Sequence, residues 1–92
     1  MDGWNLKKAP EFNLPGNIIP NEFIIALMDG TDPKAWITGF EEYKMEIVKP
    51  LESKPGMWLI RYDESTLHPG NMINLIKMSD EVIVAEFNKK QQ

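Results

Sequence analysis

Residues 63–71 contain the side chains whose types suggest catalytic chemistry. Asp63, Ser65 and His68 are the residue types of a hydrolase triad, but their spacing within one turn does not aim a nucleophile at a base. No glycine pattern typical of an oxyanion hole accompanies them. Asp63, Glu64 and His68 are also metal-ligating types, yet the chain has no second histidine and no cysteine to complete a tetrahedral zinc site. We therefore predict no catalytic site, no metal, no cofactor and no enzyme activity.

Three short strands are predicted in the first half of the chain. Asp29-Gly30 ends the first strand, because this dipeptide favours positive φ and reverses an antiparallel strand. Gly39 weakens or bends the second strand, and Glu41-Glu42 opens the turn into the third. The expected strands of this meander cover residues 23–28, 34–40 and 44–48.

Strand signals continue through the second half, and no segment shows a convincing helical period. Further strands are predicted over residues 57–62, 72–78 and 81–87. The fold class is therefore all-β, a small and strongly bent five-stranded antiparallel barrel with an additional C-terminal strand. The expected organisation is an extended, proline-containing N-terminal arm, the barrel, and a C-terminal strand and tail, over residues 1–20, 21–78 and 79–92 respectively.

The length, cysteine content, hydropathy and net charge of the chain limit the classes of protein to which it can belong. A chain of 92 residues forms one small domain, which would gain stability from a partner subunit. The absence of cysteine excludes disulfides and thiolate chemistry and permits a reducing, cytoplasmic location. No apolar run approaches the roughly 20 residues of a membrane-spanning helix, so no membrane association is expected. The formal net charge of −4 opposes non-specific binding to phosphate backbones, so any nucleic-acid site must be local.

Two motifs give the chain a family resemblance. A turn glycine precedes an apolar residue, a glycine, an aromatic residue, an acid and a second aromatic residue in the order Gly30, Ile37, Gly39, Phe40, Glu41 and Tyr43. A later turn, His68-Pro69-Gly70-Asn71, leads into the apolar segment 72–76. Together, over residues 21–78, these motifs resemble those of the Sm and Sm-like (LSm) proteins, which include the bacterial RNA chaperone Hfq. The likeness is greatest to divergent Sm-like proteins attributed to bacteriophage.

The resemblance implies a homo-oligomeric ring that binds single-stranded RNA. Strand 57–62 of one subunit would pair with strand 72–78 of the next, closing a ring of about five to seven subunits. The loops at 41–45 and 68–71 would then line a central pore, with Tyr43 stacking on a base. The implied RNA-binding residues are Tyr43, Lys44, Met45, His68, Gly70 and Asn71.

A second hypothesis is a small β-barrel module that oligomerises or docks on a partner protein, for example a phage-encoded protein acting on a host protein, without RNA binding. It is favoured by the acidic balance and by two departures from the family pattern. Met45 stands where the family has a base-reading asparagine, and Pro69 stands where it has an arginine. A thioether cannot donate and accept hydrogen bonds to a base edge as an amide does.

Overall fold

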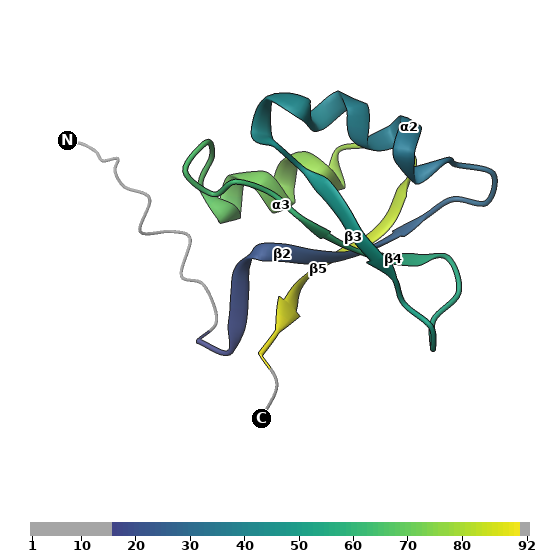
Figure 1. Ribbon diagram of the computed structural model, residues 1–92, viewed down its shortest axis with the longest axis horizontal. Helices are drawn as coiled ribbons and strands as arrows, with labels where there is room; N and C mark the ends of the chain where they lie inside the picture. The colour runs from purple at the N-terminus through teal and green to yellow at the C-terminus, as the bar shows by residue number, and fades with distance from the viewer. Residues whose placement is uncertain (1–15, 91–92) are drawn as a thin grey trace.

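The computed structural model describes residues 16–90 and contains one open sheet of four antiparallel strands, with the helices on one face (Figure 1). The strand order is β3-β4-β2-β5. The elements in chain order are β2 (Ile18–Leu27), α2 (Pro33–Ile37), the 3-10 helix η2 (Thr38–Tyr43), β3 (Glu46–Pro50), β4 (Met57–Arg61), α3 (Pro69–Lys77) and β5 (Val82–Lys89). The prediction that strands dominate is confirmed.

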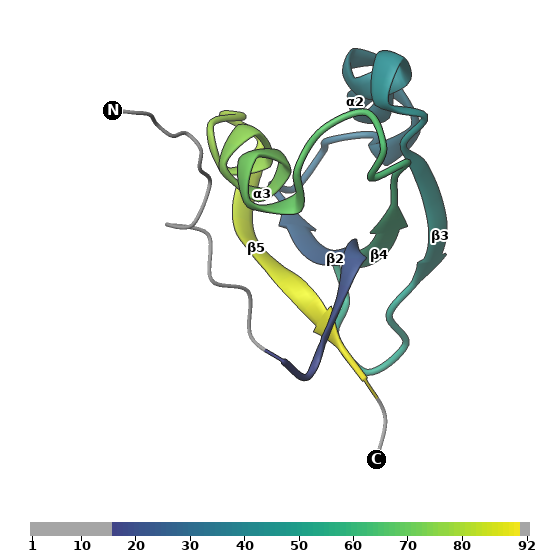
Figure 2. The same cartoon turned by 90° about the vertical axis from the view of Figure 1, so that its left-hand side faces the viewer.

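The connections form two interleaved β-α-β units. The α2–η2 segment links β2 to β3, and β4 lies between these two strands. In the same way α3 links β4 to β5, with β2 between them. Since all neighbouring strands are antiparallel, each helical connection joins two parallel strands across an inserted one. This β-α-β-β-α-β order is the split arrangement of ferredoxin-like folds, and both helical segments cover the same face (Figure 2).

The core lies between the sheet and the helices. Phe23 and Ile25 of β2, Ile60 of β4, and Met72 and Ile76 of α3 are all fully buried. On the strands these residues sit two apart or directly across the ladder, so they point to one face of the sheet. On α3 they sit four apart, which is one helical face. The apolar face of the sheet and the apolar face of α3 therefore pack against each other in a single layer.

The open face of the sheet carries a polar ladder across all four strands. Glu46, Arg61 and Glu22 are register partners on β3, β4 and β2. Arg61 donates through Nε to Glu22 (3.1 Å) and pairs with Glu46 at 3.4 Å, and the Asn88 amide of β5 donates to the other Glu22 oxygen at 3.0 Å. A one-residue slip of any strand would break this ladder, so it fixes the register.

Four predicted strands are confirmed and two are wrong. Strands expected over residues 23–28, 44–48, 57–62 and 81–87 are present as β2, β3, β4 and β5. Residues 34–40 instead form α2 and the start of η2, because Asp32 caps the helix by accepting from the Lys34 N–H (3.0 Å) and Pro33 occupies its first turn. Residues 72–78 belong to α3 and its C-cap, because His68 caps that helix and Pro69 begins it.

The sheet is therefore open rather than a closed five-stranded barrel. The predicted pairing of strand 57–62 with strand 72–78 is also wrong, because β4 has a neighbour on both sides and residues 72–77 are helical. Strand β2 already includes residues 18–20 of the predicted arm, while residues 1–15 of the arm and 91–92 of the tail lie outside the described residues. None of the helices in residues 16–90 combines the length and the apolarity needed to cross a membrane.

Candidate functional site

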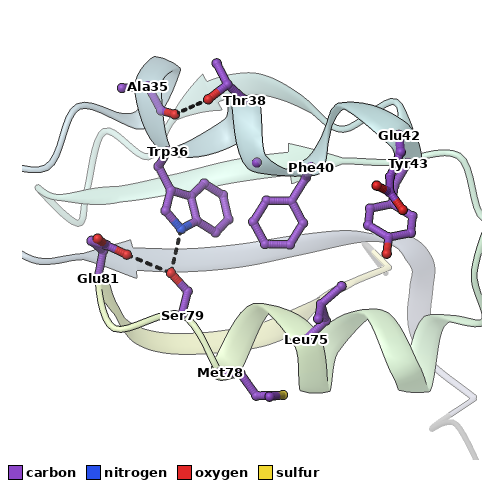
Figure 3. A pocket seen from close by; sticks show the side chains of 11 residues that line it. Ala35, Trp36, Thr38, Phe40, Glu42, Tyr43, Leu75, Met78, Ser79 and Glu81 are labelled. Carbon is purple, nitrogen blue, oxygen red and sulfur yellow. Dashed lines mark hydrogen bonds between the residues drawn. The ribbon is translucent and has the colours of Figure 1, made fainter.

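A groove runs between the α2–η2 segment and α3 on the helical side of the sheet (Figure 3). Its volume is about 580 Å³. We call it the helix groove and define it by its lining residues, which are Ala35, Trp36, Thr38, Gly39, Phe40, Glu42, Tyr43, Leu75, Met78, Ser79 and Glu81.

Two aromatic rings from one wall form the floor of the helix groove. Trp36 of α2 and Phe40 of η2 are four residues apart, and their ring centroids lie 4.8 Å apart at an angle of 40°. They are 9% and 8% exposed, and both line the groove. Phe40 departs from helical geometry, with φ of −120°, so η2 is kinked at this residue. The wall thus presents a rigid aromatic surface.

The opposite wall is aliphatic and more exposed. Leu75 of α3 faces the aromatic side chains, and Met78 follows at the C-cap of the helix (Figure 3). Met78 is 77% exposed, the highest value among the large apolar residues that are exposed in residues 16–90. A flexible thioether on such a wall adapts readily to different apolar partners.

A relay of hydrogen bonds closes one end of the groove. The Trp36 indole N–H donates to the Ser79 hydroxyl oxygen at 2.9 Å, and that hydroxyl donates to a Glu81 carboxylate oxygen at 2.9 Å. Ser79 and Glu81 lie in the turn between α3 and β5. The relay therefore connects the two walls, fixes the indole ring and holds a carboxylate at the groove rim.

Tyr43 and Glu42 form the other end. The Tyr43 ring lies 6.4 Å from the Phe40 ring and packs against the core, with its hydroxyl pointing toward α3 (Figure 3). Partial burial raises the pKa of the Tyr43 phenol, and the neighbouring negative charge of Glu42 raises it further. A side-chain hydrogen bond with Glu42 acts in the same direction, so the phenol stays neutral.

The charge of the helix groove has one sign. Its lining contains two carboxylates, Glu42 and Glu81, and no lysine, arginine or histidine. Glu41 and Asp80 are exposed immediately beside them. An apolar floor between two anionic ends favours an apolar ligand that carries positive charge on either side.

The first three residues implied to bind RNA follow one another at the end of η2. Tyr43 lines the groove, as described above. Lys44 is the C-cap residue, in the left-handed conformation with φ of 57°, and its N–H donates to the Glu41 carbonyl at 2.9 Å. Met45 is 8% exposed and belongs to the core, so its thioether is enclosed by protein. Of the three, Tyr43 and Lys44 alone are accessible.

The other three implied residues open a helix rather than a pore loop. His68 is the N-cap of α3, where its Nδ1 accepts from the Gly70 N–H at 3.0 Å. Gly70 is buried in the first turn, and Asn71 beside it is exposed. The loop that begins at Asp63 connects the two groups of residues. At its start the Asp63 N–H donates to the Tyr43 carbonyl at 3.0 Å, and at its end lies His68.

The three residues whose types suggested a hydrolase triad, Asp63, Ser65 and His68, lie close together in the chain. Asp63 accepts from both the hydroxyl (2.7 Å) and the backbone N–H (3.0 Å) of Ser65, and these bonds lower the pKa of its carboxyl, with a smaller contribution from Lys44. Ser65 thus donates to the acid, whereas a triad serine donates to the histidine. Within residues 16–90 no group of three His, Cys, Asp or Glu side chains is arranged to hold a metal ion.

No protein-family model, no curated protein and no solved structure matches this chain. Sequence reasoning had placed Trp36 and Phe40 on a strand and so missed the helix groove. The signal that could have revealed it is Asp32-Pro33, a helix N-cap followed by a first-turn proline.

Proposed function

We propose that this chain is a protein-interaction domain without catalytic activity. Its helix groove binds a short segment of a partner protein in which apolar side chains are flanked by lysine or arginine. The observation that carries this proposal is the aromatic floor of the groove, bounded at both ends by carboxylates and by no cation.

The floor and the aliphatic wall supply the affinity. Aromatic side chains held in fixed positions contribute strongly to protein interfaces because they bury a large area and lose little entropy on binding. Trp36 is held by its hydrogen bond to Ser79 and by Phe40, so the floor is formed before a ligand arrives. Met78 then covers an apolar side chain inserted between the walls.

The two carboxylates supply orientation and partner choice. Glu42 and Glu81 lie at opposite ends of the groove, so a segment with a cation on each side of its apolar residues satisfies both (Figure 3). The net charge of −4 also favours cationic partners, because long-range attraction increases their association rate at low salt.

RNA binding through an Sm-like ring stays a prediction, and the same charges act against it. Carboxylates beside Tyr43 repel a phosphate backbone. The open face of the sheet offers no stacking platform of the kind that sheet-based RNA-binding domains use. The aromatic residues of the four strands, Phe23, Trp58 and Phe87, all pack on the helical side.

Selection of displayed peptides on the full chain tests the proposal. We expect enriched sequences with one or two apolar residues flanked by lysine or arginine. Glu42→Lys and Glu81→Lys should each raise the Kd of such a peptide about tenfold at low salt, because each removes an attraction and adds a repulsion. Glu52→Lys is the matched control: it makes the same charge change in the exposed β3–β4 loop, away from the groove, and should leave the Kd unchanged.

Two outcomes contradict the proposal. The first is an enriched set without positive charge, or equal weakening by the control variant Glu52→Lys. The second is tight binding of short U-rich or A-rich RNA at low salt that Tyr43→Ala abolishes and Glu42→Lys strengthens. That second result would establish the RNA-binding reading instead.

A further inference from the structure

Strand β5 is an edge of the sheet whose outer side has no partner strand among residues 16–90. It pairs with β2 from Val82 to Lys89, and the register shifts twice, between Ala26 and Leu27 and between Ile19 and Phe23 of β2. Ile83 and Val84 at its start are 64% and 44% exposed. A long edge strand with exposed apolar side chains and free backbone groups is a template for another strand.

The direction of the β5 backbone groups follows from its ladder with β2. The Lys90 N–H donates to the Asn17 carbonyl at 2.8 Å, so the backbone of residue 90 faces β2. Because the backbone groups of alternate residues face the same side, Glu86 and Val84 also face β2. The backbone groups of Ala85 and Phe87 consequently face the free edge.

The ladder between β2 and the β4 hairpin leads to the same assignment. The Leu27 N–H donates to the Gly56 carbonyl at 3.3 Å, on the β4 side. Its neighbour Ala26 therefore faces β5, where its register partner is Val84. Two separate ladders thus turn Ala85 outward.

The other edge of the sheet is protected. Strand β3 has only five residues, contains Lys49 and Pro50, and has a register irregularity between Ile47 and Lys49. Short length, lysine, proline and a bulge are the features that prevent an edge strand from pairing. Strand β5 has eight residues and no proline, and at the register shift between Ile19 and Phe23 the extra residues lie on β2, since the β5 partners Asn88 and Phe87 are consecutive.

We propose that two copies of this chain pair through β5 in antiparallel orientation, around a two-fold axis at Ala85, to form one continuous eight-stranded sheet. Ala85 then faces Ala85 of the second copy, and Ile83 faces Phe87. The acidic start of β5, Asp80-Glu81, comes beside the basic end, Lys89-Lys90, of the other copy. The axis repeats this contact, so the strand is complementary to itself in both backbone and charge.

Sedimentation of the full chain between about 1 µM and 1 mM tests the pairing. We expect a reversible monomer–dimer equilibrium. Lys89→Glu should raise the dimer Kd about tenfold at low salt, because it replaces attraction by repulsion at two symmetric positions. Lys49→Glu makes the same change on the protected edge strand and should have no effect. The double variant Glu81→Lys/Lys89→Glu should restore most of the affinity, since it exchanges the charges and keeps the pairing.

Amide hydrogen exchange supplies an independent readout. Protection of the Ala85 and Phe87 amides should rise with protein concentration, while protection along β3 should not. A monomer at every concentration overturns the proposal, as does a ring of about five to seven subunits. A dimer that Lys89→Glu does not weaken, or that leaves the Ala85 amide equally protected at all concentrations, overturns the two-fold register.

Discussion

The hydrogen bond between Trp36 and Ser79 should decide how firmly the helix groove is held together. Ser79→Ala removes the acceptor of an indole N–H on a side chain that is 9% exposed. No other bond of that N–H to the protein is present in residues 16–90, so the variant leaves a nearly buried donor unsatisfied. The same substitution removes the hydroxyl that orients Glu81, whose carboxylate is exposed and adds little to stability.

The expected cost follows from these two losses. A neutral hydrogen bond contributes about 1 kcal/mol net, and an unsatisfied buried donor costs about 1–3 kcal/mol. Because the indole keeps some exposure and can relax toward water, we expect Ser79→Ala to lower the free energy of unfolding by about 1–2 kcal/mol. For a domain of this size that is a fall of about 4–16 °C in Tm.

Urea denaturation followed by far-UV circular dichroism measures the change, with the midpoint shifted and the slope constant. Ser53→Ala, in an exposed loop, is the matched control and should stay within about 0.3 kcal/mol of the wild type. Ser79→Thr keeps the hydroxyl and should recover most of the loss. If Ser79→Ala is no more costly than Ser53→Ala, the indole is held by packing alone and the relay does not organise the groove.

Two further substitutions test the framework of the fold. Tyr62→Phe deprives the Leu67 carbonyl of a donor at 2.6 Å and should cost about 1 kcal/mol in urea denaturation. Burial also raises the pKa of the Tyr62 phenol, so its contribution to the free energy of unfolding is complete below the unfolded-state pKa near 10 and is lost as pH rises above that value. Tyr62→Phe should therefore lose less stability at alkaline pH than the wild type. An unchanged dependence of stability on pH would contradict this role of Tyr62. Lys44→Gly should raise the unfolding free energy by about 0.5–1 kcal/mol, because a left-handed residue with φ of 57° is strained with a side chain and relaxed without one; a neutral or lower value would show that no strain is stored there.

The strands were predictable because local signals and tertiary packing agree there. The apolar run over residues 23–28 is β-branched and ends at a turn in which Gly30 has φ of 89°. A strand that is central in the sheet and buried on one face can be predicted from its own residues. The position of β5 beside β2 was not predictable, because strand order depends on contacts between segments more than fifty residues apart in the chain, and these leave no mark on local composition.

The polar candidates of the loops illustrate a different limit. The family resemblance implied that His68 and Asn71 bind RNA, whereas in the structure His68 caps a helix and Asn71 lies in its first turn. A side chain that can bind phosphate can equally satisfy a free helix N–H, and its type alone does not distinguish the two uses. The helix groove was missed because both of its walls come from segments that were predicted as strands, although Asp32-Pro33 marks the start of one of them as a helix.

The misassigned helices have a common physical cause. Trp36 and Phe40, and likewise Met72 and Ile76, are four residues apart, a spacing that puts both members on one face of a helix and also on one face of a strand. The polar residue midway between them separates the two possibilities. In a strand Thr38 and Asn74 would share the buried face with their apolar neighbours, whereas in a helix they turn away, and both are exposed. Burying an unpaired hydroxyl or amide costs more than short helices lose in propensity. The polar position at i+2, rather than the apolar pair, therefore selects the helix in both segments and with it the groove between them.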